Sequence, residues 1–216
     1  MRSRWIDVEQ YTDEWEALRL GRVTCSQFGC FMACDPGAFG EPARRYALQI
    51  ALERLTGRRA GTRFGNEHTA RGHAQEPVAR MLYEAERFVD VRRGGFFDCG
   101  GWGSSPDGLV GAEGVVEIKS VIAPVHYATL LRGTFDPAHR WQLVGHLDCS
   151  RRQWVDCVSY CADFPESQQL IVHRLTREQC AAELARLAKR RAAFLKLTND
   201  ILKTIARAAE PAALAA

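Results

Sequence analysis

Apolar and polar residues alternate over several short stretches of the chain, which is the pattern of half-buried β-strands. They predict strands over residues 89–97, 104–110, 115–121, 154–161 and 169–175. Gly111 and Gly114 favour a tight turn between the second and third of these strands, which should therefore pair as a hairpin.

Longer stretches repeat their apolar residues every three or four positions, which predicts amphipathic helices. These are expected over 13–19, 26–33, 42–57, 67–88, 124–131 and 137–147, with a long final helix after Thr176. Thr176 and Gln179 form a capping box for that last helix, whose apolar stripe suits packing on the domain or on a neighbouring subunit. The order of elements predicts an α/β (α+β) fold, with a mixed central sheet flanked by helices. Residues 1–210 should form one domain and 211–216 a flexible tail.

The composition is that of an ordinary globular domain, since 46% of the 216 residues are hydrophobic and 25% are charged. The formal net charge of +3 is too small to identify a nucleic-acid-binding protein. Basic residues do occur in pairs or triplets, at 44–45, 58–59, 92–93, 151–152 and 189–191. Such runs can follow phosphates, although solvated helix faces explain most of them. No apolar run has the length of a signal peptide or membrane span, so we expect a cytoplasmic protein with no membrane partner.

The chain has eight cysteines, and none of them forms a CxxC pair. Without secretion, the expected state of these residues is the reduced thiol. Cys157 and Cys161 share one face of the strand predicted over 154–161, so they should be small core residues. The spacing also disfavours an iron–sulfur cluster.

The strongest candidate for chemistry lies at the predicted hairpin. Pro106 and Gly108 make the backbone around Asp107 irregular, and the turn brings Asp107 across from Glu117. Glu117 and Lys119 project from the same side of their strand, while the apolar residues between and before them face the other side.

Two carboxylates and a lysine so arranged are typical of a divalent-metal site that cuts phosphodiesters. Asp107 would bridge the metals, Glu117 would be a second ligand and the carbonyl of Ile118 a third, because hard oxygen ligands suit Mg²⁺ or Mn²⁺. Two such ions roughly 3.5–4 Å apart can activate water and neutralise phosphate charge. Lys119 would orient the attacking water or offset developing negative charge. The alternative is a hairpin with a surface Glu–Lys pair, since charged residues on a strand usually face solvent.

At these residues the chain resembles the lambda-type alkaline exonucleases, the YqaJ-like phage recombination exonucleases of the restriction-endonuclease-like superfamily. The core signature of that family is an acid, a spacer, then glutamate-x-lysine, as in Asp107 and 117–119. Its other motifs are similar, in the same order, to an arginine–serine segment at 15–26, a helical glutamate motif at 71–76 and a glutamine motif at 141–146.

The resemblance implies a Mg²⁺-dependent 5′→3′ exonuclease, with Mn²⁺ as a substitute, that digests one strand of duplex DNA. It also implies a restriction-endonuclease-like core, a homotrimeric ring and a single-strand annealing recombinase as partner. The implied active-site set is Glu76, Asp107, Glu117, Lys119 and Gln142, with Glu76 as a further metal ligand. By the same resemblance, Arg19, Ser26 and Ser105 would hold the terminal 5′ phosphate, as an arginine fork with two hydroxyls can do without reading a base.

The chain departs from the family pattern at two positions of the glutamine motif. His146 replaces an aromatic residue, and Val144 replaces a second glutamine that would help to hold the phosphate. Two other functions stay open: a structure- or sequence-specific endonuclease with the same metal core, and a DNA-binding module with a dead nuclease fold.

Overall fold

The computed structural model describes residues 3–61 and 67–209, so the predicted tail over 211–216 lies outside the described residues. Its larger sheet has the strand order β3-β6-β7-β8-β9. The bounds are β3 Val91–Arg93, β6 Gly108–Val110, β7 Gly114–Ser120, β8 Trp154–Tyr160 and β9 Leu170–Thr176. β7 and β8 are parallel and the other pairs are antiparallel, so the sheet is mixed, as predicted.

A second, smaller sheet has the order β1-β4-β5-β2 and was not predicted. Its strands are β1 Arg4–Ile6, β2 Val23–Thr24, β4 Phe96–Asp98 and β5 Trp102–Ser104. The predictions of single strands over 89–97 and 104–110 were therefore wrong, because each stretch is shared between the two sheets. Gly94 and Gly95 break the first stretch with φ angles of 47° and 88°, which glycine adopts readily.

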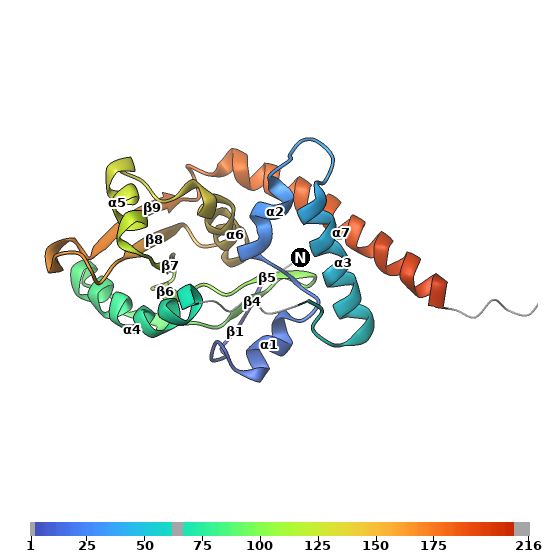
Figure 1. The fold of residues 1–216 in the computed structure, drawn as a ribbon, viewed down its shortest axis with the longest axis horizontal. Helices are drawn as coiled ribbons and strands as arrows, with labels where there is room; N and C mark the ends of the chain where they lie inside the picture. Colours follow the sequence, from blue (N-terminus) through green and yellow to red (C-terminus); the bar gives the residue numbers. More distant parts are fainter. Residues whose placement is uncertain (1–2, 62–66, 210–216) are drawn as a thin grey trace, which may run out of the picture.

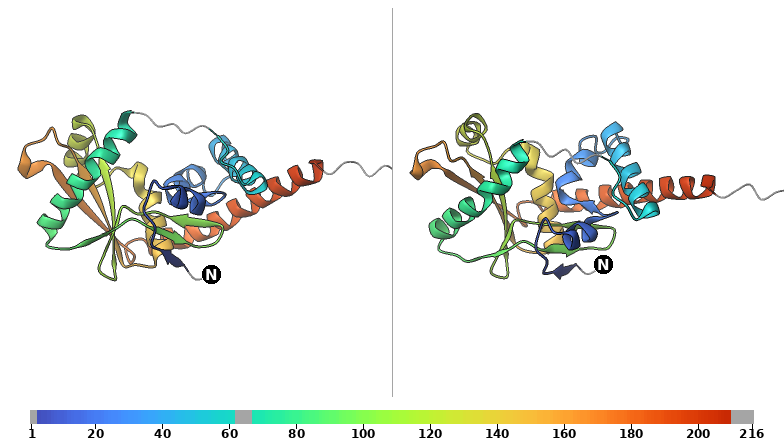
Figure 2. Two further views of the ribbon diagram at one scale, coloured as in Figure 1. Left: turned by 90° about the horizontal axis from the view of Figure 1, so that it is seen from below. Right: turned by 60° about the horizontal axis from the view of Figure 1, so that its bottom comes forward.

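The larger sheet is covered by helices on both faces (Figure 2). Helix α4 (Glu67–Arg87) packs Ala79 and Tyr83 against the face that carries Val116 and Ile118. Helix α6 (Arg140–Ser150) packs Leu143, Val144 and Leu147 on the other face, in the main core. Glu117 and Lys119 therefore lie on the α6 face, as the alternation predicted.

The other helices follow the predicted ones closely. They are α1 Asp13–Arg19, α2 Phe28–Met32, α3 Glu41–Thr56, α5 Ala123–Arg132 and α7 Ala181–Ala209, with 3₁₀ turns η1 Cys25–Gln27, η2 Pro137–His139 and η3 Glu166–Gln168. Helices α3 and α7 lie side by side at one end of the molecule, and the larger sheet, α4 and α5 lie at the other (Figure 1). The capping box forms, since Gln179 N donates to Thr176 Oγ1 and Gln179 Oε1 accepts from Thr176 N.

All eight cysteines are free thiols, as expected. Cys157 and Cys161 are buried, with exposed fractions of 4% and 1%. Within the described ranges, none of the helices is long and apolar enough to cross a membrane.

Candidate active site

The hairpin of β6 and β7 brings the two predicted acids together. Gly108 pairs with Val116, so Asp107 lies across from Glu117 at the end of the ladder. Asp107 Oδ2 accepts a hydrogen bond of 2.6 Å from the amide of Ile118, which fixes this carboxylate beside β7.

Glu117 is 3% exposed and is contacted by side chains from two elements. Its Oε1 accepts from Lys119 Nζ at 2.6 Å and from Gln142 Nε2 at 2.5 Å. Lys119 Nζ also donates to Gln142 Oε1 at 3.2 Å, which closes a triangle of polar groups. The structure thus brings together Glu117, Lys119 and Gln142, as the motifs predicted.

The second oxygen of Glu117 lies against His146, which is 1% exposed. Nε2 of His146 is 2.8 Å from Oε2 of Glu117, but neither atom is aligned for a hydrogen bond or has another such partner among the described residues. Nδ1 of His146 lies 2.6 Å from Ser104 Oγ. Gln142 and His146 do share one face of α6, as expected from their i, i+4 spacing. Val144, by contrast, is fully buried in the core.

The charges in this cluster shift one another's pKa values. Burial alone would raise the pKa of Glu117, but the positive charge of Lys119 and the adjacent His146 outweigh it and lower that pKa to about 2. Burial opposes the charge of Lys119 too, yet Glu117 and Asp107 raise its pKa, so it stays protonated at neutral pH. Burial, followed by the negative charges of Glu117 and Glu76, raises the pKa of Asp107 well above its usual value.

Glu76, on α4, acts on Asp107 through its negative charge, which helps to raise the pKa of that acid. Its carboxylate forms an ion pair with Arg80, one turn further along the helix. Over the described ranges, no group of three or more His, Cys, Asp or Glu side chains is placed to hold a metal ion. The donors nevertheless suit a cation in kind, since they are hard oxygens, and Oε2 of Glu117 is a buried carboxylate oxygen whose nearest polar neighbour is His146 Nε2 at 2.8 Å.

Two of the three residues predicted to bind phosphate are in contact. Arg19 Nη1 donates to Ser105 Oγ at 3.4 Å, and its guanidinium lies 4.0 Å from the centre of the Trp15 ring. Trp15 Nε1 also donates to Ser105 Oγ, at 2.9 Å.

The third predicted residue lies apart. Ser26 is exposed on η1, and its hydroxyl lies 3.3 Å from that of Thr24. Arg19 and Ser105 therefore form a polar pair, with Ser105 two residues before Asp107, and the hydroxyl of Ser26 pairs with Thr24 instead.

Tyr11 lies in the loop before α1, where its ring contacts those of Trp15 and His73, and it was not singled out from the sequence. Partial burial raises its pKa, and the negative charges of Asp107, Glu76 and Glu117 raise it further. Ser104, which bonds to His146, was also missed. Ser104 stands at the start of the stretch around Asp107 but was given no role, and Tyr11 belongs to no motif, so only the fold reveals their contacts.

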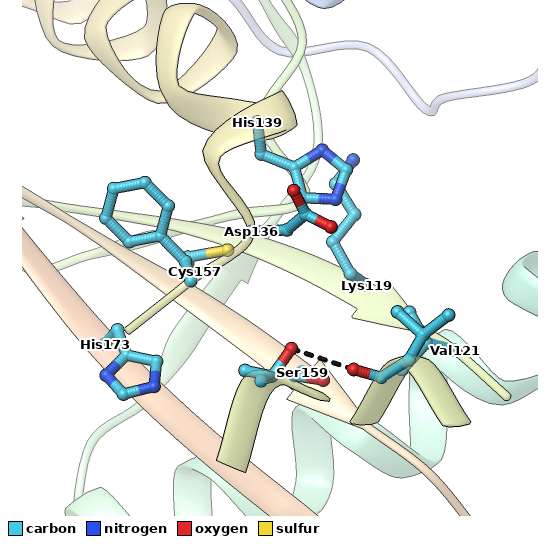
Figure 3. Close-up of a pocket in the computed structure, with 10 residues that line it drawn as sticks. Lys119, Val121, Asp136, His139, Cys157, Ser159 and His173 are labelled. Atoms are coloured by element: carbon cyan, nitrogen blue, oxygen red, sulfur yellow. Dashed lines mark hydrogen bonds between the residues drawn. The ribbon is translucent and has the colours of Figure 1, made fainter. Parts of the chain in front are cut away.

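Lys119 also lines a cavity (Figure 3). The polar lining further includes Asp136, which caps η2, His139 in η2, and Ser159 and His173 from the sheet. Burial and the positive charge of Lys119 lower the pKa of His139, so this imidazole is neutral at pH 7 and adds no charge to the site.

Comparison with known proteins assigns this geometry to a family. Residues 14–153 match the YqaJ-like viral recombinase domain. The chain belongs to the YqaJ-like viral recombinase family. Its structure is similar to that of the alkaline exonuclease LHK-Exo from Laribacter hongkongensis, with a TM-score of 0.82 and 32% identity over 92% of this chain and 98% of that one. LHK-Exo in complex with dAMP matches with the same TM-score and coverage, at 33% identity.

A phage-related exonuclease from Haemophilus somnus 129PT shares the fold of this YqaJ-like protein. Its TM-score is 0.69 at 12% identity, over 85% of this chain and 96% of that one. No curated protein matches the sequence. The predicted family and fold class are confirmed, and the protein is a nuclease of the phage recombination exonuclease type. The roles of the individual site residues stay predictions.

Proposed function

We propose that this YqaJ-like protein is a metal-dependent 5′→3′ exonuclease that digests one strand of duplex DNA from a 5′-phosphorylated end. One observation carries the proposal: the acids and Lys119 form a single cluster at the end of β6 and β7, and Ser105 of the Arg19–Ser105 pair stands two residues before Asp107. A strand whose terminal phosphate binds to that pair would present its first phosphodiester to the acids. The dAMP complex of LHK-Exo supports a site of mononucleotide size in such enzymes.

Asp107, Glu117, Glu76 and the carbonyl of Ile118 would hold Mg²⁺, or Mn²⁺ in its place. When bound, the metal supplies charge neutralisation on the phosphate and an acidified water molecule. Glu76 would have to leave its ion pair with Arg80 to take part.

Lys119 would act as a cation, because its neighbours raise its pKa and keep it protonated. From its place beside Glu117 it would donate to the attacking oxygen or to the phosphate, and so stabilise the negative charge that develops there. Gln142 forms hydrogen bonds with both Glu117 and Lys119, so it would fix the positions of these two side chains relative to each other. Arg19 and Ser105 would bind the terminal phosphate without reading a base.

The test uses end-labelled linear duplexes, with and without a 5′ phosphate, and closed circular DNA, each incubated with Mg²⁺. We expect 5′→3′ digestion of the linear duplexes, faster with the phosphate, and an intact circle. Arg19→Ala should remove the phosphate preference, whereas Arg45→Ala, which alters an exposed arginine outside the site, should keep it. Cutting of the circle would favour an endonuclease. DNA binding without digestion, equal in the wild type and in Asp107→Asn, would favour a DNA-binding module with a dead site.

The remaining features of the proposal concern the assembled protein. Residues 1–210 would act as one nuclease domain in a homotrimeric ring in the cytoplasm. The 3′ single strands that it exposes would pass to a single-strand annealing recombinase.

A further inference from the structure

Tyr11 has an unusual backbone for an aromatic residue. It lies in the loop between β1 and α1 with a φ angle of 68°, in the left-handed region that favours glycine. Its side chain is nevertheless 52% exposed, so burial of the ring does not account for the strained position. Strain of this kind persists where the surrounding structure fixes it, and it is common at binding sites.

The residues on both sides of Tyr11 are anchored. Gln10 Nε2 donates to the carbonyl of Pro106 at 2.7 Å, which ties the loop to the residue before Asp107. Thr12 caps α1 by accepting from the amide of Trp15 at 3.3 Å. The backbone that carries the ring is therefore held on both sides, by Gln10 at the residue before Asp107 and by Thr12 at the start of α1.

The ring contacts two aromatic side chains near the proposed site. Its centroid is 5.3 Å from that of Trp15, which donates to Ser105. It is also 4.1 Å from the ring of His73, on the turn of α4 before Glu76, and about half of Tyr11 stays exposed. The acids at the proposed cutting site also act on its hydroxyl.

We infer that Tyr11, flanked by His73, is a stacking platform for the base of the terminal nucleotide on the strand that is cut. This inference rests on the proposed function, in which that nucleotide spans from a phosphate at Ser105 to the bond at Asp107. Tyr11 is an exposed aromatic residue whose ring contacts Trp15, which donates to Ser105, and His73, which lies on α4 three residues before Glu76. Stacking of this kind accepts any base, since every base has an aromatic face, so it would hold the end without selecting a sequence.

The test compares 5′-phosphorylated duplexes whose terminal nucleotide is either intact or abasic. Tyr11→Gly removes the ring and suits the backbone, so its melting temperature should match or exceed that of the wild type. We expect this variant to lower kcat/KM for the first cut about tenfold on intact ends, and to have less than a twofold effect on abasic ends. Tyr11→Phe should keep the discrimination between the two ends.

A second readout is direct. With 2-aminopurine as the terminal base, binding should quench its fluorescence in the wild type and in Tyr11→Phe, but not in Tyr11→Gly. Phe88→Gly is a matched control, because Phe88 is also an exposed aromatic residue at positive φ, at the end of α4. An equal loss by Tyr11→Gly on intact and abasic ends, or no loss on either, would overturn the inference. Failure of the proposed function would look different, since the wild type would then not digest duplex ends from the 5′ side.

Discussion

At the scale of residues, the site is built around the two oxygens of one buried carboxylate. Oε1 of Glu117 accepts from Lys119 and Gln142, whereas Oε2 faces His146. His146 is held in turn by Ser104. Because its Nε2 lies 2.8 Å from Oε2, the imidazole limits how the carboxylate can turn, so we expect it to support Glu117 as a metal ligand.

His146→Ala should weaken metal binding rather than abolish activity. We expect the Mg²⁺ concentration for half-maximal activity to rise about 10–100-fold, which a titration of activity with Mg²⁺ measures. Stability should fall by roughly 1–3 kcal/mol, because Ser104 and Glu117 each lose a buried neighbour. His126→Ala is the control: His126 is also buried and contacts Ser159 and Gln168, but not the acids. An equal rise for both variants would contradict a specific role for His146.

At the scale of elements, helix α4 is fastened to the larger sheet through one buried tyrosine. Tyr83 Oη donates to Asp156 Oδ2 at 2.8 Å, and Asp156 also pairs with Arg174 at 2.7 Å. Glu76 lies on the same helix, so the hydrogen bond between Tyr83 and Asp156 also helps to position Glu76. Burial, followed by the charge of Asp156, raises the pKa of Tyr83.

Tyr83→Phe should cost about 1.5–3 kcal/mol at neutral pH, since it removes a hydrogen bond to a charged group. A raised pKa means that the fold favours the neutral phenol. Its contribution is therefore complete below the unfolded pKa of about 10 and is lost as pH rises from there through the folded pKa. Urea unfolding from pH 7 to 11 should show the wild-type and Tyr83→Phe stabilities converging above pH 10. Tyr127→Phe, at an exposed tyrosine, should run parallel to the wild type throughout.

The break between β3 and β4 separates the two sheets and depends on a glycine. A Cβ at Gly95 would lie 2.2 Å from the Trp5 ring and 2.8 Å from the carbonyl of Ile6, at a φ of 88°. Gly95→Ala should therefore cost about 2–5 kcal/mol, through clash and backbone strain together. Gly57→Ala shares the positive φ but meets nothing within 4 Å, so it should cost only about 1–2 kcal/mol. Chemical denaturation of both variants measures the difference, and equal losses would exclude the clash.

At the scale of the whole molecule, several arginines form hydrogen bonds and ion pairs with other parts of the chain. Arg152 donates to the carbonyls of Gly111 and Gly114, and Arg191 pairs with Asp148. Arg190 is 8% exposed and donates to the carbonyls of Phe31 and Gly37 at 2.8 and 2.7 Å. Arg190 and Arg191 connect the long helix α7 to the rest of the fold, and Arg152 does so for the β6–β7 hairpin. The net charge of the chain is only +3.

Arg190→Ala should destabilise the protein by about 2–4 kcal/mol, because it leaves buried carbonyls without donors and removes a cation that lies 3.9 Å from the centre of the Phe39 ring. Lys189→Ala changes the exposed neighbour in the same basic triplet and should stay within about 0.5 kcal/mol of the wild type. Thermal unfolding measures both. If only Lys189→Ala lowered the melting temperature, the packing of α7 would be misassigned.

The sequence by itself determined the helices, the β6–β7 hairpin and the cluster of Asp107, Glu117 and Lys119. These features depend on local periodicity, on turn residues and on spacing within a few positions, which a single chain displays directly. Gln142 also came from its motif, and the structure confirmed its contact with Glu117.

Only the tertiary structure decided the rest. The split of 89–97 and 104–110 between two sheets depends on partners far away, since β1 and β2 pair with β4 and β5 through contacts that local pattern does not encode. Tyr11 contacts His73, and His146 contacts Ser104, because loops, strands and helices distant in sequence are brought together by the fold. These tertiary contacts depend on long-range packing, and neither a tyrosine nor a histidine in the sequence predicts them.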